Sequence, residues 1–394
     1  MQFNMKKCIV LFFLVLPCFI QAQTLTDQAT ISVVTFGPYQ GETYSAFGHS
    51  GIRVYDPANK IDDLYNYGVF DFDQPHFYLN FARGSSFYKL GISDYPRFRD
   101  HYIYYNRYVH EQVLNLTPAQ TQKVFEYLVW NALPENASYR YDYFYDNCAT
   151  KIPAVMRASL GDSVQFDGSY IKTNYSIRDL TDIYLTKQPW GDLGIDVCLG
   201  LPMDKKASPY EYMFLPDYVE SSFDHATIKN DTATIPLVKG KRLVYQSRDE
   251  IVTGPPHPLY VFSAFAVITI ALSVWDVKRK KTSTWFDVIL FGIVGLAGLL
   301  LFCLWFFTDH KAAARNMNLL WALPTHLFAV FAFIKNPKWL TKYFLVVSII
   351  TALLLGFWFL LPQKMNVALV PLVVAILARE FTQFKVRQST KQFS

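Results

Sequence analysis

The sequence lacks several features that define common function classes. Its five cysteines form no CxxC pair, and the histidines between residues 23 and 250 show no HExxH or similar ligand spacing, so we expect no zinc or other metal site and no cofactor. The net charge is only +5, and no basic patch is interleaved with aromatic residues. Nucleic acid is therefore not an expected partner. Internal repeats and low-complexity tracts are also absent.

Long apolar runs are missing from residues 23–250, although 52% of the chain is hydrophobic and 17% aromatic. The apolar residues gather instead at the two ends. At the N-terminus, Lys6 and Lys7 precede an apolar stretch from Cys8 to Ile20, with a small residue for cleavage at Ala22. This pattern is typical of a secretory signal over residues 1–22. We therefore expect residues 23–250 to form one exported, globular domain.

After a Pro- and Gly-rich hinge at residues 251–258, the composition becomes membrane-like through residue 394. Apolar runs predict an all-α bundle of about five transmembrane helices, near residues 259–275, 285–307, 319–334, 343–361 and 367–378. Lys and Arg cluster after the first, third and fifth runs, which places these clusters and the C-terminus in the cytoplasm and the exported domain outside. Residues 308–318 and 362–366 are then the outward loops.

The exported domain has the alternating and helical patterns of an α+β fold. Residues 31–36, 50–55 and 64–72 alternate like strands, and residues 102–114 are rich in strand-forming side chains. A capping box with proline at the first helical position, Thr117-Pro118-Ala119-Gln120, predicts a helix to about Asn131.

Cys148 is the sharpest chemical signal in the chain. It follows Asp146-Asn147 at the expected start of a helix, where unpaired N–H groups and the helix dipole favour a thiolate. His49, next to Gly48 at the start of a strand-like run, is the best candidate for its base. A cysteine at a helix start and a histidine on a strand are the parts of a Cys–His acyl-transfer site. The structural alternative is a Cys148–Cys198 disulfide.

Further residues are candidates around this pair. Asn66, and less strongly Asp71, would orient His49 from the neighbouring strand, unless both are merely solvated strand residues. Tyr143, Phe144 and Tyr145 just before the cysteine would form an acyl-chain wall, or else an aromatic part of the core.

The first outward loop carries a second polar cluster, at a helix junction on the same side as Cys148. Its members would bind a lipid head group, or would simply lie in water above the membrane: Asp309, His310, Arg315, Asn316 and Asn318.

Taken together, these motifs make the chain similar to the Lnb-type lipoprotein N-acyltransferase family. The resemblance rests on Ala46-Phe47-Gly48-His49-Ser50, Tyr65-Asn66-Tyr67-Gly68, Tyr105-Asn106-Arg107, Leu114-Asn115-Leu116-Thr117, Tyr143 to Thr150, Phe214-Leu215-Pro216, and Asp309-His310 with Asn316, Asn318, Leu319, Leu320 and Trp321. The Asn-Cys step also resembles the wider permuted papain-like (NlpC-like) group, and the His-before-Cys order fits a circular permutation.

The resemblance implies a multi-pass protein of the bacterial inner membrane with a periplasmic catalytic domain. It further implies transfer of a fatty acyl chain from a membrane phospholipid, through a Cys148 thioester, to the α-amine of diacylglyceryl lipoproteins, with His49 and Cys148 as the catalytic pair. The role of Asn66 does not come from the resemblance. Two alternatives stay open: a membrane-anchored cysteine peptidase or amidase acting on peptidoglycan, and a non-enzymatic membrane sensor.

Overall fold

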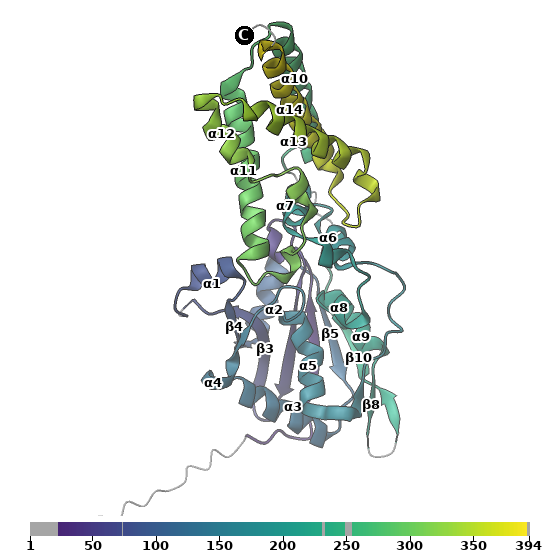
Figure 1. Ribbon diagram of the computed structural model, residues 1–394. Coiled ribbons are helices and arrows are strands. Elements are labelled where there is room, and N and C mark those ends of the chain that lie inside the picture. Colours follow the sequence, from purple (N-terminus) through teal and green to yellow (C-terminus); the bar gives the residue numbers. More distant parts are fainter. Residues whose placement is uncertain (1–22, 73, 231–232, 249–253, 392–394) are drawn as a thin grey trace, which may run out of the picture.

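The computed structural model describes residues 23–72, 74–230, 233–248 and 254–391. The expected secretory signal at residues 1–22 and residues 251–253 of the expected hinge lie outside the described residues. The remainder forms an exported part built on a β-sheet and an elongated bundle of helices joined to one end of it (Figure 1).

A seven-stranded antiparallel sheet organises the exported part. Its strands, in spatial order, are β10 (Val238–Tyr245), β5 (Val109–Leu114), β1 (Thr30–Phe36), β2 (His49–Asp56), β3 (Ile61–Phe70), β4 (Phe87–Asp94) and β6 (Ser138–Arg140). The three alternating segments expected at 31–36, 50–55 and 64–72 thus correspond to the central strands β1, β2 and β3. A smaller sheet contains β7 (Val164–Gln165), β8 (Thr227–Lys229) and β9 (Thr234–Pro236).

Successive side chains of a strand point to opposite faces of the sheet. Both faces of the large sheet carry apolar side chains, and helices cover both faces. On one face, Ile31 and Val33 pack in a core with α3 (Pro118–Asn131) and α5 (Cys148–Leu160). On the other face, Val34 and Phe36 pack against α2 (Tyr95–Tyr104). The capping box predicted before α3 is present, with Thr117 and Gln120 bonded reciprocally.

The β-rich interpretation of residues 102–114 is half wrong. The segment begins as the last turn of α2 and becomes strand β5 only at Val109. Asp94 caps α2 by accepting a hydrogen bond from the Arg97 N–H, and proline lies in the first turn. This N-terminal signal outweighs the strand preference of the aromatic residues that follow.

The described residues of the exported part contain six further α-helices. They are α1 (Phe77–Arg83), α4 (Pro134–Ala137), α6 (Ile177–Leu185), α7 (Pro189–Cys198), α8 (Pro209–Tyr212) and α9 (Pro216–His225). Figure 1 shows α6 and α7 at the junction with the bundle, and α3 at the opposite end of the exported part.

Within residues 254–391, the bundle consists of five α-helices: α10 (Pro258–Lys278), α11 (Thr284–Phe306), α12 (His326–Lys335), α13 (Trp339–Gly356) and α14 (Val370–Lys391). Among the described residues, α10, α11 and α13 are long and apolar enough to cross a membrane, whereas α12 is shorter. The expected third helix at 319–334 begins only at His326, because Met317–Leu320 forms a short 3-10 helix. The fourth, expected at 343–361, lies earlier in the chain, at 339–356.

The fifth helix departs most from its prediction at 367–378, because it continues through the charged residues that end the apolar run. Arg379 is fully buried and bonds to Asp287 of α11 at 2.7 Å and to Asp276 of α10 at 2.8 Å. These ion pairs lie inside the bundle, so the helix needs no apolar residues at these positions.

Candidate active site

Cys148 is the first residue of α5, and Asn147 caps that helix. The Asn147 Oδ1 accepts hydrogen bonds from the N–H groups of Ala149 and Thr150, both at 2.9 Å, and its Nδ2 donates to the carbonyl oxygens of Tyr143 and Phe214. The amide therefore fixes the start of the helix to two neighbouring segments. The backbone N–H of Cys148 lies close to the sulfur of the same residue.

Burial and nearby N–H groups act in opposite directions on the Cys148 thiol. Burial is the larger influence and raises its pKa to about 11, while the backbone N–H groups of Ser50, Ala149 and Cys148 lower it. The Ser50 N–H belongs to the residue directly after His49 in β2. The thiol is thus protonated at rest and surrounded by donors that would stabilise negative charge on sulfur or on a bound oxyanion.

Gly68 of β3 allows the backbone to approach the cysteine closely. Its φ is +87°, and a Cβ atom added there would lie 3.3 Å from the Cβ of Cys148 and 3.8 Å from Cε2 of Tyr141. Both the left-handed conformation and the lack of space favour glycine at this position.

His49 is held by a hydrogen bond between its Nε2 and the Oδ1 of Asn66 on β3. Because an amide oxygen only accepts, this bond places the imidazole proton on Nε2 and leaves Nδ1 as the basic nitrogen. The ring lies among Phe36, Phe98 and Tyr102. Burial lowers the pKa of His49 to about 4, the bond to Asn66 opposes this change, and the positive charge of Arg107 adds to it. The imidazole is neutral at neutral pH.

Asp71, the second expected orienter, lies beyond the end of β3. Its carboxylate pairs with Lys89 at 3.4 Å instead of with His49. Of the two candidates, the structure brings Asn66 to the histidine.

The Cys148–Cys198 alternative is not realised. Cys148, Cys198 and Cys303 are all free in the part of the chain that the structure describes. Cys198 is the last residue of α7, and burial raises the pKa of its thiol.

A cavity of about 210 Å³ lies between the segment before Cys148 and the first outward loop. Of the three residues predicted to form an acyl-chain wall, Tyr143 and Phe144 line this cavity, whereas Tyr145 lines a different cleft. Tyr141, next to Gly68, lines the cavity as well and was not among the expected residues.

The first outward loop contacts the exported domain directly. The Asp309 N–H donates to the carbonyl oxygen of Arg83 at 2.7 Å, and its carboxylate pairs with Arg140 at 2.8 Å. The His310 ring lies against Gly84, and both residues line the 210 Å³ cavity. Residues from the membrane bundle therefore form part of the wall of this cavity.

The other loop residues have different positions from those expected. Arg315 lines a separate cleft with Lys205 and Tyr145. Asn316 and Asn318 are buried, and their side-chain amides donate to the carbonyl oxygen of Val197 in α7 at 2.7 and 3.2 Å. Their interpretation as head-group contacts is therefore corrected: they join the bundle to the exported domain.

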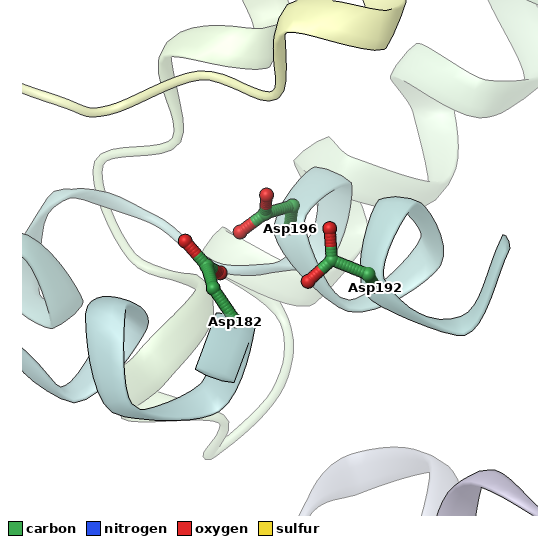
Figure 2. Close-up of side chains that lie close together, drawn as sticks. All are labelled: Asp182, Asp192 and Asp196. Carbon is green, nitrogen blue, oxygen red and sulfur yellow. The ribbon is translucent and has the colours of Figure 1, made fainter. Parts of the chain in front are cut away.

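Three aspartates at the same junction were missed by sequence reasoning. Asp182 of α6 and Asp192 and Asp196 of α7 bring carboxylate oxygens within 4.8 Å of one another (Figure 2). An all-oxygen set of this kind suits a hard cation, but Asn366 donates to Asp192 and Asp196 at 3.0 Å, and Lys364 bonds Asp182 at 2.8 Å. These partners come from the second outward loop. The spacing of four between Asp192 and Asp196 is the sequence signal that both face one side of a helix.

Two carboxyl groups of this acidic cluster have raised pKa values. Burial, followed by the charge of Asp196, raises the pKa of Asp192 to about 7 and that of Asp182 to about 6. Arg178, fully buried, pairs with Asp196 at 2.7 Å and with Asp204 at 2.9 Å. The junction between the two parts of the protein is thus a network of ion pairs and hydrogen bonds around the buried Arg178 and Asp196.

Comparison with known proteins assigns both parts of the chain. Residues 19–183 match the family described as the Lnb N-terminal periplasmic domain, and residues 250–391 match the Lnb transmembrane domain. No curated protein and no solved structure gives a match. The two matches cover most of the chain and describe a multi-pass inner-membrane protein with a periplasmic N-terminal domain. The chain therefore belongs to the Lnb-type lipoprotein N-acyltransferase family.

Proposed function

We propose that the protein transfers a fatty acyl chain from a membrane phospholipid to the α-amine of the N-terminal diacylglyceryl-cysteine of lipoproteins, through a thioester on Cys148. The observation that carries the proposal is the position of Cys148. Its sulfur lies at a capped helix start, among N–H donors and beside the strand that carries the Asn66-bound His49.

The first half-reaction would acylate the cysteine. His49 accepts the thiol proton at Nδ1 while the sulfur attacks an ester carbonyl of the phospholipid. The Cys148 N–H stabilises the resulting oxyanion. As the carbon–oxygen bond breaks, the lysophospholipid alcohol takes the proton from His49, and the acyl chain remains as a thioester.

The second half-reaction would release the acyl chain to the lipoprotein. The neutral α-amine attacks the thioester carbonyl, an amide bond forms, and the carbon–sulfur bond breaks. His49 accepts the proton that the amine loses and returns it to the sulfur, which restores the neutral pair. The pKa directions support this general-base route over a resting thiolate–imidazolium pair, because burial favours the neutral form of both groups.

The cavity position supports a lipid substrate over a peptidoglycan amidase or a sensor. Asp309 and His310 of the bundle complete the wall that Tyr143 and Phe144 begin. A soluble-substrate hydrolase tethered to the membrane would not require this shared cavity. The end of α14, at the far end of the bundle in Figure 1, would then lie on the cytoplasmic side.

The proposal is tested by reconstituting the protein in phospholipid vesicles with a synthetic diacylglyceryl-cysteine peptide. Mass spectrometry of the peptide should show the gain of one acyl chain, resistant to hydroxylamine as an amide. Cys148→Ala and His49→Ala should abolish or strongly reduce this gain, while Cys198→Ala should not. Full activity of Cys148→Ala would exclude the thioester route.

A further inference from the structure

Helix α1 and its flanking segments expose an unusual number of apolar side chains. None of the seven residues of α1, all of which the structure describes, is buried. Tyr78 is 83% exposed and Phe72 is 68% exposed. Surface helices of soluble proteins normally bury one apolar face, and contiguous exposed apolar patches mark interaction surfaces. We call the exposed side chains in this region the aromatic lobe: Phe70, Phe72, Tyr78, Leu79, Phe81 and Phe87.

The aromatic lobe lies next to the loop that follows α11, one of the helices long and apolar enough to cross a membrane. The hydrogen bond from Asp309 to Arg83 fixes the end of α1 to the loop that follows α11. Phe306 and Phe307, at the end of α11, are 54% and 70% exposed. Figure 1 shows α1 at the side of the molecule, level with this end of α11. Exposed apolar side chains are therefore present on both segments that the Asp309–Arg83 hydrogen bond joins, the end of α11 and the lobe.

The charges around the lobe suit an anionic lipid surface. Arg83 and Lys311 are exposed, and the Arg140 side chain is 53% exposed although it pairs with Asp309. Aromatic side chains with basic residues at their edge are characteristic of segments that lie in the head-group region of a bilayer.

Packed aromatic rings lead from the lobe toward the cysteine. The ring centroids of Phe70 and Phe72 are 5.5 Å apart, those of Phe70 and Tyr88 4.7 Å, and those of Tyr88 and Tyr141 4.0 Å. Tyr141 and Cys148 both flank Gly68. Phe81 of the lobe, Tyr88 and Tyr141 also line the 210 Å³ cavity. A series of packed aromatic rings therefore leads from the exposed lobe, along one wall of the cavity, to Tyr141 near Cys148.

We infer that the aromatic lobe inserts into the periplasmic leaflet of the inner membrane and admits a phospholipid acyl chain to the 210 Å³ cavity, which is lined by the segment that precedes Cys148. Insertion of the lobe stands on its exposure and position alone. The delivery of the acyl chain rests on the proposed function. The lobe would place the donor ester near the sulfur without removing the whole lipid from the bilayer.

Insertion is tested by spin-label accessibility in vesicles of phosphatidylethanolamine and phosphatidylglycerol. Tyr78→Cys and, as a second position, Phe72→Cys carry the label, with the other cysteines of the mature chain replaced by serine. Trp130→Cys is the control, because Trp130 is 52% exposed on α3, at the far end of the exported part. Labels on the lobe should collide more with oxygen than with a water-soluble nickel chelate, and the control label should do the reverse. Lobe labels that behave like the control would overturn the inference.

Delivery is tested by comparing two acyl donors. The double variant Phe72→Asp/Tyr78→Asp should lower the rate of Cys148 acylation from vesicle phospholipid by on the order of tenfold or more, relative to acylation from a short, water-soluble nitrophenyl ester. Trp130→Asp should change neither rate. An equal loss with both donors would refute delivery through the lobe. If neither donor acylates the wild-type cysteine, the proposed function fails, whereas the spin-label result still decides insertion.

Discussion

Asn66→Ala would remove the amide oxygen that holds the His49 ring through its Nε2–H. The ring could then rotate and change tautomer, so Nδ1 would no longer be fixed as the basic nitrogen. A buried hydrogen bond whose loss leaves one partner unsatisfied is worth about 1–3 kcal/mol. Expressed as a barrier to Cys148 acylation, this range corresponds to about a 5- to 150-fold lower rate.

Asn66→Asp should keep the hydrogen bond but change the pH dependence. Burial lowers the pKa of His49 to about 4 in the wild type. A carboxylate in place of the amide would favour the charged imidazolium and raise this pKa by about one to three pH units. Because the base must be neutral to accept the thiol proton, acylation is lost as pH falls through the pKa of His49. The acid limb should therefore lie near pH 4 in the wild type and at about pH 5–7 in the variant.

The measurement is the single-turnover acylation rate with the soluble nitrophenyl ester from about pH 3 to about pH 9, in detergent. A soluble donor keeps lipid titration out of the profile. Asp71→Asn is the matched control, since Asp71 pairs with Lys89, and its profile should follow the wild type. An Asn66→Asp limb that does not move, or a wild-type rate in Asn66→Ala, would refute the assignment of Asn66 as the residue that orients His49.

Three further changes test the surroundings of the site. Gly68→Ala should lower the free energy of unfolding by about 1–2 kcal/mol, because alanine disfavours the left-handed φ, and should displace the neighbouring thiol. Both the melting temperature and the acylation rate should fall. Gly194→Ala should change neither, because a Cβ atom added there meets open space. Asp287→Ala removes one of the carboxylates that pair with the buried guanidinium of Arg379. The variant should lower the free energy of unfolding of the bundle by about 3–5 kcal/mol, measured by thermal unfolding in detergent. The pKa of Asp192 is raised to about 7 in the folded protein, so the protonated carboxyl contributes stability at a pH below its pKa in the unfolded chain. This contribution is lost as pH rises toward about 7. Asp192→Asn should therefore flatten the decline of the melting temperature between pH 4 and 7.

The sequence predicted best what depends on local patterns. Strict alternation located the three central strands, and the capping box located α3, because both signals arise within a few residues. The Asn147-Cys148 step similarly predicted a cysteine at a helix start. The cap of α2 at Asp94, with proline in the first turn, is an equally local signal, but the interpretation of residues 102–114 considered only their strand-forming side chains.

Long-range partners were harder to predict. Charged residues in α14 ended the expected fifth apolar run, although Arg379 finds its carboxylates on two other helices. In the same way, Asn316 and Asn318 were interpreted as ligand contacts because their partners in α7 are more than a hundred residues away. The permuted papain-like fold likewise stays a prediction, since single-chain patterns specify elements better than their connection in space.

The most direct test of the central claim is the covalent state of Cys148 after incubation with phospholipid vesicles. We predict a fatty-acyl mass on the Cys148 peptide that hydroxylamine removes, that is much reduced in His49→Ala, and that a diacylglyceryl-cysteine peptide discharges as an N-acyl product. An unmodified Cys148 in protein that nonetheless acylates the peptide, or an acyl mass at full level in His49→Ala, would contradict the Cys–His mechanism.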